Sequence, residues 1–238
     1  MNGLIKDFKV KTEELNEYFS FIEFIDNVET HKRERLTIQD NAIVRNDTVI
    51  KRELQKILRA NSFLLLYNLV ESSIRNAIIA VYDSIHDKNL SYDELSERLQ
   101  EVWLSHKTKE LQNKTNNVKN WLKELMKEVT VDNQVLLDKD SINISGNLDY
   151  DNINKIINTY GFFGSISGDK TTIKNAIDKV KKERNLLAHG NKTFCQSGEI
   201  ITLGELKLIR DTIINYLDEI LGNTKNYIHN ERFKKNTQ

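Results

Sequence analysis

The chain has 238 residues and no proline, and its 39% hydrophobic and 29% charged residues are ordinary for a globular protein with a substantial core. Lysine plus arginine and aspartate plus glutamate both number 35, so net charge cannot drive nucleic-acid binding, which would need a local basic patch. The single cysteine, Cys195, excludes an intramolecular disulfide and favours a cytoplasmic protein. The charged N-terminus predicts that there is no signal peptide, and the short apolar runs predict neither a membrane span nor a membrane partner.

The N-terminal part of the chain is predicted to consist of long amphipathic helices. Residues 4–35 form the first helix, and residues 36–47 form a polar loop that contains a short extended piece. Residues 48–86 form the strongest helical segment, because apolar residues recur there at three- and four-residue spacing. The recurring residues are Phe63, Leu66, Tyr67, Val70, Ile74, Ala77, Ile78 and Val81.

Two shorter helices are predicted after this segment. Ser91 and Glu94 have the spacing of a capping box, in which each side chain satisfies a backbone donor of the first turn. This spacing predicts a helix over about 91–106, and the apolar pattern predicts another over about 114–128. The inward-facing residues of the second helix would be Val118, Trp121, Leu122 and Leu125.

The C-terminal half is predicted to contain an irregular insertion and two further helices. Residues 130–168 are rich in Asn, Asp, Ser and Gly, and we expect a small hairpin and a short helix near 151–159 within them. Helices resume over 169–189 and over about 203–230, with a loop or small hairpin between them. The sequence therefore predicts an all-α, antiparallel helical bundle that forms one domain over residues 1–238, with residues 130–168 as an insertion.

The helix predicted over 169–189 carries an arginine on its apolar stripe. The stripe consists of Ile173, Ile177, Val180, position 184 and Leu187. Because an unpaired buried charge is very costly, Arg184 needs a partner or a wet cleft. An apolar row of the helix over 48–86 carries a carboxylate at Glu71, which could form a charge-assisted contact with an arginine. We therefore expect Glu71 to be the partner of Arg184.

The same helix is predicted to end on a histidine. Gly190 follows His189 directly, and a glycine in this position typically forms a left-handed C-cap. The exposed carbonyls at a helix end favour a positive charge, so His189 would be suited to hold and exchange a proton. The alternative interpretation is that His189 is only a cation that caps the helix.

The spacing of these residues adds a geometric constraint. On a straight helix, Arg184 and His189 would point roughly 140° apart, whereas Asn185 and His189 would share a face. One straight helix therefore cannot present all three side chains to one atom. Either the helix end is distorted at Gly190, or two copies of the helix meet at a twofold interface and combine their residues.

The surroundings of this motif are basic. Residues 170–192 contain seven Lys or Arg and two acidic residues, a local net charge of +5. Such a patch could attract a polyanion, and Lys181, Lys182 and Lys192 are candidates for binding it. The alternative interpretation is a solvated, lysine-rich helix face.

Two stretches of the chain resemble the HEPN superfamily. The segment from Arg184 to His189 fits the R-x(4–6)-H motif, with a polar residue after the arginine. Residues 62–78 resemble the first core helix of HEPN proteins, especially those of the MAE-type branch found in bacterial defence and toxin loci. The resemblance implies a metal-independent endoribonuclease without a cofactor that acts as a homodimer on RNA. The RNA 2′-OH would attack the adjacent phosphorus and leave a 2′,3′-cyclic phosphate and a 5′-OH.

The resemblance also implies roles for individual residues. His189 would transfer a proton, and Arg184 would bind the scissile phosphate and stabilise the charge that develops on it. Asn185 would orient the phosphate or the histidine, and Glu71 would either hold Arg184 or act on the 2′-OH. Some HEPN toxins carry a tyrosine two residues after the histidine that a partner enzyme modifies. Asn191 stands there in this chain, so an antitoxin or defence-system partner would have to act differently.

Two other functions remain open at this point. A catalytically inactive HEPN module that binds RNA or a protein partner would need the same helix and the same basic patch. A purely structural helical dimer would need neither Arg184 nor His189 beyond their contribution to stability. The chain shows no phosphate-binding glycine loop and no zinc-ligand spacing, so we expect neither a metal nor a cofactor.

Overall fold

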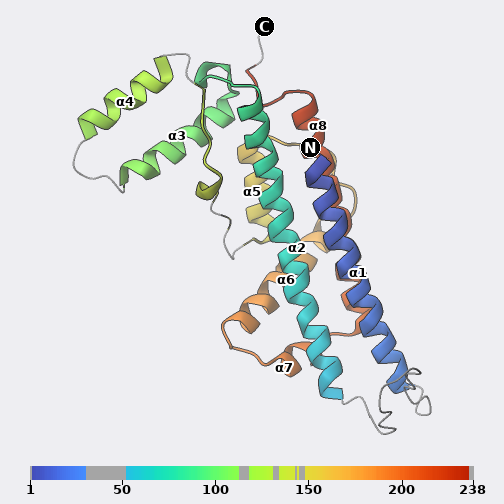
Figure 1. The fold of residues 1–238 in the computed structure, drawn as a ribbon. Coiled ribbons are helices and arrows are strands. Elements are labelled where there is room, and N and C mark those ends of the chain that lie inside the picture. Colours follow the sequence, from blue (N-terminus) through green and yellow to red (C-terminus); the bar gives the residue numbers. More distant parts are fainter. Residues whose placement is uncertain are drawn as a thin grey trace, which may run out of the picture. The chain divides into compact units, whose positions relative to one another are not determined.

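The computed structural model describes residues 2–30, 52–112, 118–130, 134–142, 144 and 148–235, and these residues fold into eight α-helices and two short 3-10 turns. The helices are α1 (Asn2–Thr30), α2 (Arg52–Asp87), α3 (Glu97–Gln112), α4 (Val118–Thr130), α5 (Tyr150–Tyr160), α6 (Lys170–Ala188), α7 (Phe194–Glu199) and α8 (Leu203–His229) (Figure 1). The all-α prediction is confirmed. The predicted loop over 36–47 and the end of the first predicted helix lie outside the described residues.

The chain divides into two compact units, each assembled from segments that are distant in sequence. Unit 1 comprises Met1–Lys6, Glu71–Asp169 and Asn215–Gln238, and unit 2 comprises Asp7–Val70 and Lys170–Ile214. Unit 1 therefore holds α3, α4 and α5, whereas unit 2 holds α6, α7 and most of α1. That the whole chain forms one domain stays a prediction.

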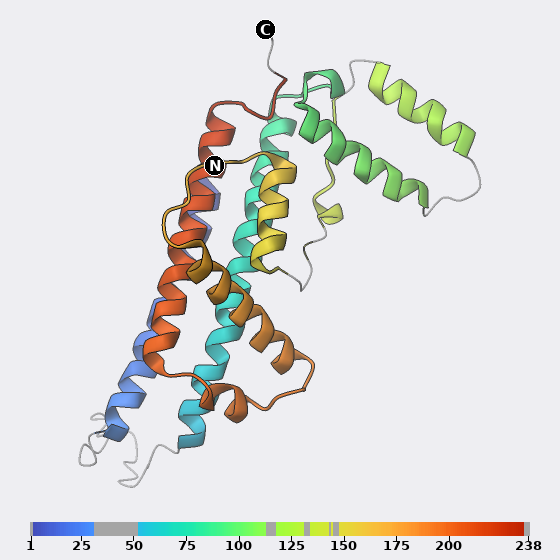
Figure 2. The ribbon, with the colours of Figure 1, turned by 180° about the vertical axis from the view of Figure 1, so that it is seen from behind.

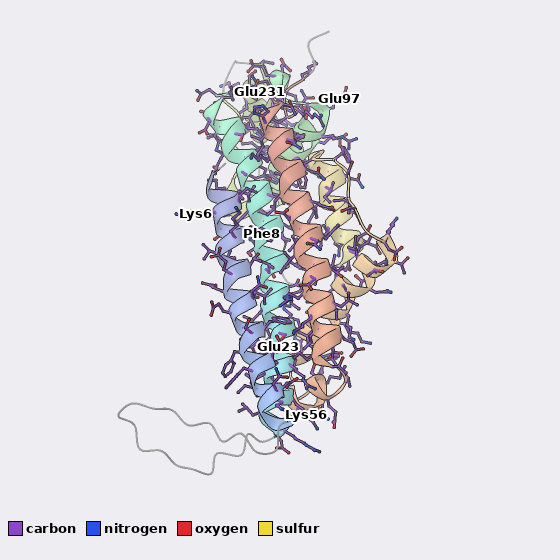
Figure 3. All side chains as sticks on the ribbon, turned by 90° about the vertical axis from the view of Figure 1, so that its right-hand side faces the viewer. Lys6, Phe8, Glu23, Lys56, Glu97 and Glu231 are labelled. Carbon is purple, nitrogen blue, oxygen red and sulfur yellow. The ribbon has the colours of Figure 1, made fainter. Side chains whose placement is uncertain are left out.

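Unit 2 has an apolar core to which α1, α2, α6 and α8 contribute. Its buried side chains include Phe8, Phe19 and Ile22 of α1, Phe63 and Leu66 of α2, Ile177 and Val180 of α6, and Leu206 and Ile213 of α8. Polar contacts tie α1 to α2, because the hydroxyl of Tyr18 donates to the carbonyl of Leu58 at 2.8 Å and Arg59 pairs with Asp26 at 2.6 Å. Figure 3 shows Phe8 and Glu23 along α1, with Lys56 at the start of α2.

Helix α7 stands where the sequence analysis predicted a loop or small hairpin. Thr193 and Gln196 form a capping box, in which the amide of Thr193 donates to the Gln196 side chain at 2.9 Å. This spacing was present in the sequence and was overlooked. Figures 1 and 2 show α7 beside the N-terminal part of α2. The two helices approach closely at Gly198, where a Cβ would lie 1.8 Å from the carbonyl oxygen of Lys56.

In unit 1, α3 begins later than predicted. The amide of Ser91 donates to the carboxylate of Glu94 at 2.8 Å, but this capping box starts a 3-10 turn over Tyr92–Glu94 and not the α-helix. Leu95 then takes an extended conformation and forms a β-bridge with Lys234. This pairing with the C-terminal segment interrupts the helix, so α3 begins only at Glu97.

The prediction that the helix after α3 faces inward is wrong. None of the residues of α4, all of which the structure describes, is buried, and Val118 and Leu122 have exposed fractions of 52% and 46%. Trp121 and Leu125 are half-buried. Although α4 is amphipathic, its apolar face is not part of the core of unit 1.

The insertion contributes one helix to the core of unit 1. Helix α5 covers the short helix predicted near 151–159, and its N-cap Asp149 accepts a hydrogen bond from the amide of Asn152 at 2.7 Å. The hydroxyls of Tyr160 and Tyr82 lie 2.8 Å apart, which ties α5 to α2 within this unit. In the part of the insertion that the structure describes, no hairpin forms, so that expectation is not met.

Helix α2 contains an apolar window that the sequence analysis did not expect. By length and composition over 18 residues, it is the one helix among those described that could cross a membrane, and 50% of that window is buried inside the structure. Core helices of soluble proteins pass the same test. The absence of a membrane partner stays a prediction.

Candidate functional site at the end of helix α6

The buried charged residue of α6 is Glu183 and not Arg184. The buried positions of the helix are Ile173, Ala176, Ile177, Val180, Glu183 and Leu187. Glu183 is only 3% exposed, whereas Arg184 is half-buried. Both positions border the apolar stripe. The burial of Glu183 depends on Lys192 and Ser197, which follow α6 in the sequence. The fully buried charge of the helix thus lies one residue before the predicted stripe position, and Arg184 itself is only half-buried.

Arg184 is held by an aromatic ring and by its neighbour in the chain. Its guanidinium carbon lies 4.2 Å from the ring centroid of Tyr67, a buried residue of α2. Its Nη1 donates to the side-chain oxygen of Asn185 at 2.8 Å. A cation over a ring face is attracted by the ring quadrupole, and the side-chain amide fixes the rotation of the guanidinium. Two of the predicted site residues are thus brought together.

The predicted partner Glu71 lies in α2, one turn after Tyr67 and on the same helix face. Its side chain is half-buried. Glu71 belongs to unit 1, whereas Arg184 belongs to unit 2. The pairing of Glu71 with Arg184 stays a prediction.

Helix α6 ends in a glycine cap, as the sequence predicted. Gly190 has a φ of +69°, in the left-handed region that favours glycine. The amide of Asn191 donates to the carbonyl of Leu186 at 2.9 Å, and that of Gly190 donates to the carbonyl of Leu187 at 3.1 Å. These two bonds are those of a Schellman motif, which satisfies the last carbonyls of the helix and reverses the chain.

His189 is exposed at this helix end and keeps the helical register. Its backbone amide donates to the carbonyl of Asn185 at 3.0 Å, the bond expected of a continuing helix. The chain leaves the helix only after His189. The separation of roughly 140° between Arg184 and His189 around the helix therefore stands. The helix end at His189 is therefore not distorted in a way that would direct the side chains of Arg184 and His189 toward one atom.

Comparison with protein families identifies the family of this chain. The model of the MAE_28990-like HEPN family matches residues 2–233, which is nearly the whole chain and includes α2, the Arg184 region and the capped helix end. The chain belongs to this HEPN family. No curated protein and no solved structure matches it. HEPN domains serve as nucleases or RNA-binding modules, and the family is generally associated with ribonucleases.

The three lysines predicted to bind substrate in this HEPN site have different surroundings. Lys182 is exposed and Lys181 is half-buried, both on α6. The ammonium of Lys192 lies 3.0 Å from both carboxylate oxygens of Glu183. Glu183 would therefore compete with an RNA phosphate for the ammonium of Lys192.

Sequence reasoning overlooked three residues of this region. Tyr67 was identified only as a core residue, although its ring carries the guanidinium of Arg184. Glu183 and Ser197 were not singled out, and the hydroxyl of Ser197 donates to the carboxylate of Glu183 at 2.5 Å. The acidic residue directly before the motif arginine was the available signal for Glu183. Nothing in the local sequence indicated Ser197.

Proposed function

We propose that this HEPN protein is a metal-independent endoribonuclease. The observation that carries the proposal is the arrangement of α6, on which a guanidinium fixed by Tyr67 and Asn185 precedes an exposed histidine at a capped helix end. A fixed guanidinium suits a phosphate, because its planar donors can contact two oxygens at once. An exposed imidazole can reach a substrate hydroxyl and transfer its proton.

The proposed reaction is an internal transesterification. His189 accepts the proton of a 2′-OH, whose oxygen attacks the adjacent phosphorus while the bond to the 5′-oxygen breaks. The leaving oxygen receives a proton from water, and His189 returns the proton that it accepted to the solvent, so the products are a 2′,3′-cyclic phosphate and a 5′-OH. Arg184 contacts the non-bridging oxygens and offsets the charge that develops on them. Asn185 keeps the guanidinium oriented.

We propose further that the active form is a homodimer with a composite site. The support is geometric, because His189 keeps the helical register and points away from Arg184 on its own helix. A twofold axis next to this helix would place Arg184 of one copy near the partner subunit's His189. The same operation generates a second, equivalent site.

The decisive experiment is cleavage of total RNA by the purified protein in EDTA. We expect the wild type to cleave, and Arg184→Ala and His189→Ala each to lose at least about 100-fold in rate. Matched controls are Arg210→Ala, which removes a guanidinium lying 4.8 Å from the ring of Phe19, and His229→Ala, which removes the last residue of α8. Both controls should cleave at the wild-type rate.

Mapping of the cleaved ends tests the chemistry itself. The 3′ fragments should accept a label from polynucleotide kinase without prior phosphatase treatment, because their 5′ ends carry a free hydroxyl. Cleavage that requires a metal ion, or that survives both site substitutions, contradicts the proposed mechanism. RNA binding that is unchanged in His189→Ala, with no cleavage by any form, would identify a catalytically inactive RNA-binding HEPN module.

The cellular role that we propose is that of a cytoplasmic toxin or antiphage effector, restrained by an antitoxin or a defence-system partner. The support is the membership of a HEPN family that is generally associated with ribonucleases. Induced expression of the wild type should arrest growth, whereas expression of His189→Ala to the same level should not. Equal growth of the two strains would contradict this role.

A further inference from the structure

The carboxylate of Glu183 is buried and fully engaged. Its exposed fraction is 3%, and a buried charge without partners would be very costly. Lys192 Nζ lies 3.0 Å from each of its oxygens, and Ser197 Oγ donates to Oε2 at 2.5 Å. One cation and one hydroxyl therefore compensate the charge within unit 2.

Both partners of Glu183 come from the chain beyond the helix end. Lys192 follows Glu183 by nine residues and Ser197 follows it by fourteen, so the two bonds draw the segment after Gly190 back onto α6. Ser197 itself lies in α7, where its neighbour Gly198 packs against the backbone of Lys56 in α2. The segment is thus fixed at both of its ends.

His189 lies between these fixed points. It follows Glu183 by six positions and precedes Lys192 by three. The turn after His189 is held by the glycine cap and by the amide of Lys192, which donates to the carbonyl of Leu186 at 3.2 Å. The cap at Gly190 determines where the chain turns. The bonds of Glu183 to Lys192 and Ser197 determine the direction in which the loop after Gly190 continues. A carboxylate that does not face solvent can therefore control the placement of an imidazole that does.

We propose that Glu183, together with Lys192 and Ser197, positions His189 for the ribonuclease reaction, an inference that rests on the proposed function. Glu183 is a positioning residue, because its carboxylate is buried and contacts Lys192 and Ser197. Lys192 then acts through Glu183, and its role in the site is to hold the loop. This assignment replaces its predicted role in binding RNA.

The test compares Lys192→Met with Lys192→Arg, which restores a cation for Glu183. The first readout is the NMR spectrum of protein labelled with 13C-histidine, in which the His189 ring signal is assigned by its loss in His189→Ala. We expect Lys192→Met to shift or broaden this signal, Lys192→Arg to restore it, and the other four of the five histidines to be unaffected. The protein need not be active for this readout.

The second readout is the separation of kcat from KM on a short RNA substrate. Lys192→Met should lower kcat at least about tenfold with little change in KM, because the imidazole is misplaced while the phosphate site is intact. Lys207→Met is the matched control, since it removes another lysine–glutamate pair of unit 2, with Glu23 at 2.5 Å. This control should change neither readout. Glu183→Gln and Ser197→Ala should reproduce the effect of Lys192→Met where they fold.

The outcomes separate this proposal from the proposed function. An unchanged His189 signal and kcat in Lys192→Met would overturn the positioning role. A rise in KM alone would also overturn it, because it would show that Lys192 contacts the RNA directly. A wild-type protein that never cleaves RNA, but whose His189 signal responds to Lys192→Met and recovers in Lys192→Arg, would refute the ribonuclease and retain the positioning role of Glu183.

Discussion

The guanidinium of Arg184 lies over the ring of Tyr67, 4.2 Å from its centroid. This contact joins the two stretches of the chain that resemble HEPN proteins, because Tyr67 belongs to residues 62–78 and Arg184 begins the R-x(4–6)-H motif. The first stretch therefore does more than form the core. It supplies the ring over which the guanidinium of Arg184, the proposed phosphate-binding group, lies.

Replacement of Tyr67 by leucine should weaken RNA binding. Leucine keeps the site apolar but removes the ring face, a loss of about 0.5–1 kcal/mol, which corresponds to a two- to fivefold increase in Kd. Tyr67→Phe keeps the ring and should retain most of the affinity. Fluorescence anisotropy with a labelled RNA measures this in the His189→Ala background, where no cleavage interferes.

Phe19→Leu is the matched control for this prediction. The guanidinium carbon of Arg210 lies 4.8 Å from the ring centroid of Phe19 in the same unit, so leucine replaces an aromatic ring beneath a different arginine. Its Kd should equal that of the unsubstituted background. Equal affinities of the Tyr67→Leu and Tyr67→Phe proteins would show that the ring does not support the phosphate-binding group.

Gly190→Ala should destabilise unit 2 through the backbone alone. Among the described residues no atom lies within 4 Å of a Cβ at this position, so steric overlap contributes nothing. The φ of +69° costs a residue with a Cβ about 1–2 kcal/mol, and asparagine should cost less than alanine. Urea unfolding of the two variants beside the wild type measures the differences. Stability equal to that of the wild type in both would contradict the role of the left-handed cap.

The features of this site that the sequence predicted are local ones. The period of the apolar residues and the glycine after His189 fix where α6 runs and where it ends, because both act over one or two helical turns. Which of the adjacent positions 183 and 184 is buried was not predictable in this way. That choice depends on Lys192 and Ser197, which reach Glu183 only after the chain has reversed.

The predictions for the start of α3 and for the inward face of α4 were wrong for the same physical reason. The Ser91–Glu94 capping box formed as predicted, but the pairing of Leu95 with Lys234 holds the next residues extended, and that partner lies far away in sequence. The stripe of α4 correctly predicted a helix, yet amphipathicity does not tell which surface covers the apolar face. In both cases the outcome depends on tertiary contacts, which the local sequence does not determine.

Gly198→Ala should destabilise the protein by overpacking. A Cβ there would lie 1.8 Å from the carbonyl oxygen of Lys56, a backbone atom that cannot move aside without shifting α2. Such overpacking costs about 1–3 kcal/mol. Gly204→Ala in α8 is the control, since no described atom lies within 4 Å of its Cβ, and alanine should leave stability equal or slightly higher. Similar urea midpoints for the two variants would show that α7 does not pack closely on α2.

The last prediction concerns acid stability and Glu231 of unit 1. Lys234 and Lys88 lie 2.6 and 2.5 Å from its carboxylate oxygens, and their hydrogen bonds, followed by their positive charges, lower the pKa of Glu231 from 4.5 to about 2. Because the folded pKa is lower than the unfolded one, Glu231 stabilises the fold at pH values above 4.5. This contribution is lost as the pH falls from 4.5 to about 2.

Glu231→Gln removes the titrating group and isolates its contribution. Its urea midpoint should be lower than that of the wild type near neutral pH, and the two midpoints should converge as the pH approaches 2, where the wild-type carboxylate is also protonated. The side chain of Glu231 is partly exposed, so 1 M NaCl should reduce the difference at neutral pH by screening both lysines. A difference that stays constant from neutral pH to pH 2, or that grows with acid, would show that the side chain contributes by packing and not by its charge.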